Sequence, residues 1–248
     1  MLGKAIYCEQ LKCKGTLIWP AFLIIPVIPV LLGAGNYLGN LEMLKSQWYS
    51  LWTQVSLFYA AFFFAPLIGA YCAFLWRNEN FNSCRNLLFA RPVSYRTIYL
   101  SKFILVCILT ILTQIWFTLL FLLAGKLAGL PGCPPQDLFF WMARGTMGAF
   151  VIAALQFFLA TEVRSFATPI AAGLAGGVTG LLAANTRAGI YWPYSLMLLG
   201  MNSNKSEDVL GANAALFASI CTVWLVFICV LGIWWMQKKP LQKMFPAA

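Results

Sequence analysis

The chain has no histidine, and only seven of its 248 residues are acidic. The lack of histidine excludes imidazole-bound haem or zinc, nucleophiles activated by histidine, and histidine proton relays. Charged residues make up 10% of the chain and hydrophobic residues 61%, whereas an average soluble protein is roughly 25% charged. A soluble fold of this length could not bury so much apolar surface, so we expect the chain to lie in a bilayer.

Two further absences limit how the protein could use energy. No acidic residue lies near the centre of an apolar segment, whereas ion-coupled transporters usually place ionisable residues at mid-bilayer. The sequence also lacks a GxxxxGK[ST] phosphate-binding loop. We therefore expect no ion coupling and no catalytic, cofactor or metal site in this chain. An ATP-driven machine would need a separate ATPase subunit.

Six apolar stretches are long enough to cross a membrane, which takes about 20 helical residues each. They cover approximately residues 17–35, 51–76, 102–125, 138–161, 166–184 and 214–236. We predict an all-α integral membrane fold with six transmembrane helices, forming a single domain over residues 1–248. The first stretch contains Pro20, Pro26 and Pro29, which should kink it. Its length favours a retained span over the alternative of a signal peptide.

The distribution of positive charge predicts the orientation of these spans. The 17 basic residues give a net charge of +10, and most fall in the N-terminal segment, the loop between spans two and three, and the C-terminus. Cytoplasmic loops of membrane proteins collect Lys and Arg. We expect a multi-pass protein of the bacterial plasma membrane with both termini in the cytoplasm. In this setting the basic excess does not indicate a nucleic-acid partner.

The polar groups deep in the predicted spans are mostly amides and hydroxyls. They include Gln54, Gln114, Gln156, Thr113 and Thr179. Such groups usually join helices through hydrogen bonds worth about 0.6 kcal/mol each. We favour this interpretation, with contact to a transported substrate as the alternative.

Residues 1–16 are predicted to form an amphipathic helix in the membrane interface. At 100° per residue, Leu2 and Ile6 fall on one side, and Lys12 and Lys14 on the other, where they can face anionic lipid headgroups. Glu9 lies at the border of the apolar face. We favour a solvated Glu9 or a pair with a nearby lysine, and the alternative is a contact with the ends of other helices.

The loop between spans two and three is predicted to contain a short docking helix. Phe81, Cys84 and Leu88 recur at helical spacing among charged residues, and their apolar side chains need a surface to cover. Pro92 should end this helix, and Ser94 can cap the next one. The alternative is a solvated basic loop.

Two features of the last third of the chain concern packing and the outer surface. The fifth span carries two overlapping GxxxG pairs, formed by Gly173 with Gly177 and by Gly176 with Gly180, which predict a tight helix-packing face. The outer loop that follows carries three aromatic residues, Tyr191, Trp192 and Tyr194. We favour an interfacial aromatic belt, with an outer substrate region as the alternative.

The order of these parts resembles that of type-2 ABC exporter permeases. Two stretches carry a closer likeness to the lantibiotic-immunity permeases of that group. Residues 9–16, EQLKCKGT, are similar to their E-x-x-K-x-K opening, and the likeness continues through WYSLW at 48–52, RNLL at 85–88, RPV at 91–93 and IYLSK at 98–102. These motifs cover only about the first 100 residues.

The resemblance implies a coupling helix between spans two and three that docks on a separate ATPase. Its contact residues would be Glu79, Phe81, Cys84, Arg85 and Leu88. It also implies a complex of an ATPase dimer with two permeases, often two different ones, in which the ATPase binds ATP and Mg. The complex would expel an antimicrobial peptide, a lantibiotic, from the membrane and so give immunity or resistance.

Other functions fit the same sequence. A type-2 ABC exporter of a lipid, a drug or an ion would have the same parts. A membrane-embedded lipid enzyme or a scaffold is a more remote alternative, because the few acidic residues are widely scattered.

Overall fold

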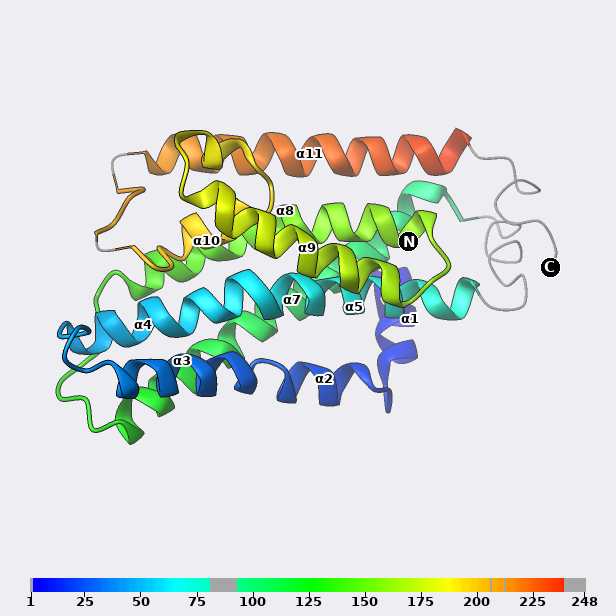
Figure 1. Ribbon diagram of the computed structural model, residues 1–248. Coiled ribbons are helices and arrows are strands. Elements are labelled where there is room, and N and C mark those ends of the chain that lie inside the picture. The colour runs from blue at the N-terminus through cyan, green and yellow to red at the C-terminus, as the bar shows by residue number, and fades with distance from the viewer. Residues whose placement is uncertain (1, 81–92, 206, 212, 239–248) are drawn as a thin grey trace.

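The chain forms a bundle of long helices (Figure 1). The computed structural model describes residues 2–80, 93–205, 207–211 and 213–238. Within these residues no strand occurs, and six helices are long and apolar enough to cross a membrane, as predicted. These candidate spans are Ile18–Gly39, Gln47–Arg77, Tyr95–Leu127, Leu138–Glu162, Ala167–Ala184 and Ala214–Lys238.

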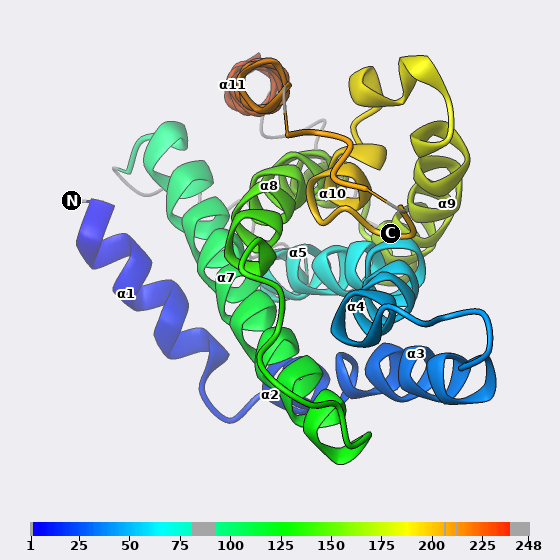
Figure 2. The same cartoon turned by 90° about the vertical axis from the view of Figure 1, so that its left-hand side faces the viewer.

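The first span is broken in its middle, as its prolines predict. It consists of α2 (Ile18–Ile24) and α3 (Val27–Gly39), and Pro26 stands at the break. Proline has no amide hydrogen to donate to the preceding turn. An N-terminal helix, α1 (Leu2–Cys13), precedes this span and lies crosswise near one end of the bundle, beside α7 (Figures 1 and 2).

The second span runs through the centre of the bundle and contains a wide turn. It consists of α4 (Gln47–Phe58), a π-helical turn η1 (Tyr59–Phe63) and α5 (Phe64–Asn80). Pro66 has no amide hydrogen to donate to the carbonyl of Phe62. In the π turn, the Phe64 amide donates to the carbonyl of Tyr59, five residues earlier. The fully buried aromatic residues Trp52 and Tyr71 anchor this span in the core.

The third span is a single helix, α7 (Tyr95–Leu127). Ser94 caps it, as predicted, by accepting a 3.2 Å hydrogen bond from the Thr97 amide. The helix begins well before Lys102, where the apolar stretch was predicted to start. The start of the helix follows from the Ser94 cap, and the charge of Lys102 within the helix is paired with carboxylates inside the protein.

The second half of the chain surrounds a short helix that enters the bundle from one end. It consists of α8 (Leu138–Glu162), α9 (Ala167–Ala184), a 3-10 turn η2 (Arg187–Tyr191), α10 (Ser195–Gly200) and α11 (Ala214–Lys238). All six residues of α10 are buried, against α8 and α9. The last helix, α11, lies at the periphery against α7 and α8 (Figure 2).

The glycines of α9 allow close packing inside the subunit. A Cβ atom at Gly173 would lie 2.6 Å from the Ala65 carbonyl oxygen, and one at Gly180 would lie 2.5 Å from the Tyr194 carbonyl oxygen. Gly177 meets the Ala61 carbonyl and Gly176 meets the Tyr194 ring. One GxxxG pair therefore faces the second span, and the other faces the chain that leads into α10.

The two ends of the bundle differ in what they carry (Figure 1). The α1 end holds α1, the end of α5, the start of α7, and the turn between α8 and α9. The α10 end holds the α3–α4 and α7–α8 loops and the entry into α10. The described residues that flank the segments predicted to be cytoplasmic thus share the α1 end.

Candidate functional site

Four charged side chains meet at the α1 end and form what we call the ionic junction. It joins Glu9 and Lys12 of α1 to Glu79 near the end of α5 and Lys102 in α7. The Lys102 amine lies 2.6 Å from Glu9 Oε2 and 2.8 Å from Glu79 Oε1, and it donates a 2.9 Å hydrogen bond to the Leu75 carbonyl. The Lys12 amine lies 2.7 Å from each carboxylate. One cluster thus fixes three separate helices.

The junction is electrically balanced and is buried apart from the Lys12 side chain, which is 39% exposed. Lys102 has an exposed fraction of 0%, and both carboxylates are nearly inaccessible. Burial acts to lower the pKa of the Lys12 amine, but Glu79 and Glu9 outweigh it and raise this pKa above its ordinary value of 10.5. Burial acts to raise the pKa of Glu79, but Lys102 and Lys12 outweigh it and lower this pKa below 4.5. These two groups therefore stay charged around neutral pH.

The junction joins the two helices, α5 and α7, that flank the segment predicted to dock on a partner. Four of the predicted contact residues fall outside the described residues: Phe81, Cys84, Arg85 and Leu88. Glu79 is described, and its side chain points into the junction and is buried. It is placed to anchor the start of the segment, and Lys102 anchors the helix that follows it.

The sequence anticipated part of this arrangement. For Glu9, a pair with a nearby lysine and a contact with other helices were considered, and the side chain makes both. Lys12, also predicted to lie on an interfacial helix, joins the junction as well. Lys14 is exposed and lies outside it. Lys102 was missed as a site residue, although a lysine within an apolar helix is a signal for a buried partner.

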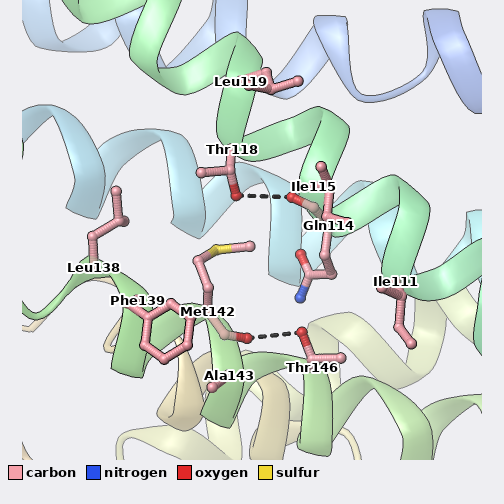
Figure 3. Close-up of a pocket in the computed structure, with 10 residues that line it drawn as sticks. All are labelled: Ile111, Gln114, Ile115, Thr118, Leu119, Leu138, Phe139, Met142, Ala143 and Thr146. Atoms are coloured by element: carbon pink, nitrogen blue, oxygen red, sulfur yellow. Dashed lines mark hydrogen bonds between the residues drawn. The ribbon is translucent and has the colours of Figure 1, made fainter.

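A second feature is a groove between α7 and α8, on the half of the bundle nearest the α10 end (Figure 3). Its volume is about 430 Å³. The residues that line it are Ile111, Gln114, Ile115, Thr118, Leu119, Leu138, Phe139, Met142, Ala143 and Thr146. Gln114 is 2% exposed, and neither its amide oxygen nor its amide nitrogen has a hydrogen-bond partner. The other deep amides are paired: Gln54 bonds Asn36, and Gln156 bonds Tyr194.

The loop before α11 is tied to the α10 end by polar contacts. Asp208 forms a 2.7 Å ion pair with Arg144 of α8. The indole of Trp52 donates to the Met201 carbonyl at 2.9 Å, and the hydroxyl of Tyr49 donates to the Lys205 carbonyl at 2.7 Å. These contacts join α4 and α8 through the loop and close this end of the bundle.

The structure separates the three aromatic residues of the predicted outer region. Tyr191 and Trp192 are exposed in and next to η2. Tyr194 lies between α8 and α9, where its ring meets Gly176 and its hydroxyl lies 3.0 Å from the Gln156 amide. Tyr194 thus packs the core, and only the other two present a surface.

Comparisons with known proteins give one finding. A family model described as ABC-2 family transporter protein matches residues 5–180. This range contains all four residues of the ionic junction and all ten that line the groove. No curated protein and no solved structure matches the chain. Among the described residues, no three His, Cys, Asp or Glu side chains are grouped to hold a metal ion.

Proposed function

The chain belongs to the ABC-2 transporter family, and we propose that it is a permease subunit of an exporter that expels an antimicrobial peptide of the lantibiotic class from the membrane. The family match makes the chain the membrane permease of an ABC transporter, a transport subunit that works with a partner ATPase. Peptide export, and the immunity or resistance it gives, is the proposal. Its support is the resemblance of the sequence to lantibiotic-immunity permeases.

The ionic junction is the observation that carries the proposed mechanism. In this mechanism, the segment 81–92 docks as a coupling helix on a dimer of ATPases that binds ATP and Mg. When the dimer closes, the segment moves the two helices that flank it, α5 and α7. Because Lys102 ties α5 and α7 to α1, all three helices move together. This motion changes access between the two sides of the membrane.

The remaining partners and the orientation follow from the same proposal. The α1 end faces the cytoplasm of a bacterial cell, and both termini lie there. The helix α1 rests in the membrane interface, with Lys4 and Lys14 exposed to lipid headgroups. A second permease, different from this chain in sequence, completes the pathway in the bilayer.

Aspartate substitutions on the predicted docking face test the coupling role. Phe81→Asp and Leu88→Asp should abolish peptide resistance in cells while the chain still inserts in the membrane, because a charge would prevent apolar docking. Met43→Asp is the matched control, because Met43 is exposed in the α3–α4 loop at the opposite end. It should keep full resistance. Full resistance in the two docking variants would refute the coupling assignment.

A substrate panel separates this function from its main alternative. The ATPase activity of the reconstituted complex should rise with lantibiotics and not with lipids, drugs or ions. Stimulation by one of those other classes alone would make the chain an exporter of that class instead.

A further inference from the structure

The groove between α7 and α8 contains a buried polar group with nothing to bind. We propose that it is a binding site for an apolar, non-helical peptide segment and that Gln114 binds the backbone of that segment. This inference rests on the proposed function and deepens it, because it locates the peptide on the permease. It also assigns a hydrogen-bonding role to one residue.

The amide of Gln114 has unused hydrogen-bonding capacity. It can donate two hydrogen bonds and accept two, yet it makes none and is 2% exposed. Leaving such a group unpaired away from water costs about 1–3 kcal/mol. The groove's two hydroxyls do not supply the missing bonds: Thr118 donates to the backbone carbonyl of Gln114 and Thr146 donates to the backbone carbonyl of Met142, each at 2.8 Å (Figure 3).

The chemistry of the amide then points to its ligand. A ligand that satisfies both the oxygen and the nitrogen must bring a donor and an acceptor together. A peptide backbone offers an N–H and a C=O at every residue, provided that a helix does not already use them. A thioether ring prevents a regular helix and leaves such groups free, which matches the class of peptide in the proposed function.

Depth in the membrane separates a peptide from a lipid. The helix α7 has 33 residues and is therefore about 50 Å long. Gln114 is three residues from the midpoint of this helix, or about 5 Å along its axis. The hydrocarbon core is about 30 Å thick, so Gln114 lies near its middle. A lipid would place its ester groups at the interface and only methylenes at this depth. Those methylenes would leave the amide unpaired.

The mouth of the groove is suited to entry from the bilayer. Ile115, Leu119 and Phe139 line it and are largely exposed on the membrane-facing surface. Its volume of about 430 Å³ falls within the 300–1,000 Å³ usual for ligand sites. Apolar side chains of the peptide can therefore contact the walls, and the Gln114 side chain, whose amide is covered in this structure, turns to meet the backbone.

Photocrosslinking tests the site directly. The complex with p-benzoylphenylalanine in place of Phe139 is placed in phosphatidylglycerol vesicles with a synthetic apolar peptide closed by a thioether ring. After illumination, mass spectrometry should find the peptide attached to this position. Adducts with lipid alone, at saturating peptide, would overturn the proposal.

A pair of substitutions tests the role of Gln114. Gln114→Met has nearly the same shape without the amide, and it should weaken peptide binding about tenfold, the loss expected for one or two hydrogen bonds. Gln54→Met is the matched control: it removes the same amide from α4, outside the groove, and peptide binding should stay within twofold. Unchanged peptide binding in Gln114→Met would overturn the proposal.

Thermal stability without peptide distinguishes binding from packing. If Gln114 binds cargo, the methionine variant should unfold at the same temperature as the wild type or higher, because a buried unpaired amide is removed. A lower unfolding temperature would show a structural role instead. Failure of the proposed function is a separate outcome, in which the wild-type complex gives no peptide-stimulated ATPase activity at all.

Discussion

Replacing Lys102 by methionine should loosen α1 from the bundle, because it leaves two buried carboxylates with a single lysine. Removing one partner of a buried ion pair usually costs 3–5 kcal/mol, and Lys12 still lies 2.7 Å from both Glu9 and Glu79, so we expect the lower limit, about 3 kcal/mol. For a chain of this size, such a loss lowers the unfolding temperature by about 6–12 °C. Thermal unfolding of the purified complex measures it.

A second substitution shows whether the loss comes from unpaired charge. Adding Glu9→Gln to Lys102→Met leaves one lysine, Lys12, for the remaining carboxylate of Glu79. The double variant should therefore be more stable than Lys102→Met alone. Lys14→Met is the control, because Lys14 is exposed on the same helix and outside the junction. Its effect should be within about 0.5 kcal/mol.

Two results would refute this reasoning. The first is an unchanged unfolding temperature in Lys102→Met, which would mean that the junction does not hold α1. The second is a double variant whose loss equals the sum of the two single losses, which would mean that the charges act independently.

Two further predictions concern pH and packing. Glu79 has a lowered pKa, so its contribution to stability is present above pH 4.5 and is lost as pH falls through the lower folded value. Lys12 has a raised pKa, so its contribution is present below pH 10.5 and is lost as pH rises through the higher folded value. The difference in unfolding temperature between wild type and the Glu79→Gln/Lys12→Met variant should thus be constant between these limits and shrink outside them; a change near neutral pH would contradict this. Gly173→Ala should destabilise by about 1–3 kcal/mol, because its Cβ would lie 2.6 Å from the Ala65 carbonyl oxygen. Gly35→Ala, which meets nothing within 4 Å, should leave the unfolding temperature equal or higher; equal losses in both variants would show that contact with α5 is not the cause.

The features of this fold that depend on neighbouring residues could be predicted from the sequence. The six spans follow from runs of apolar residues, the break in the first span follows from Pro26, and the start of α7 follows from the Ser94 cap. Each of these depends on chemistry within one or two helical turns. The family resemblance depended on the same kind of local signal, and it named the permease correctly at the level of the ABC-2 family.

The features that depend on distant pairing could not be predicted. Lys102 and Glu9 are separated by 93 positions, and no local pattern says which carboxylate a lysine in an apolar helix will find. The three deep glutamines looked alike in sequence. Only the packed helices show that Gln54 and Gln156 have side-chain partners and that Gln114 has none.

The central claim is that this chain is the permease of an ATP-driven peptide exporter. The most direct measurement is the ATPase activity of the complex, purified through this chain with its genomic neighbours and reconstituted in vesicles, with and without a lantibiotic. The account predicts that an ATPase co-purifies and that the peptide raises its activity. A co-purified ATPase that no peptide stimulates would contradict the peptide-export claim.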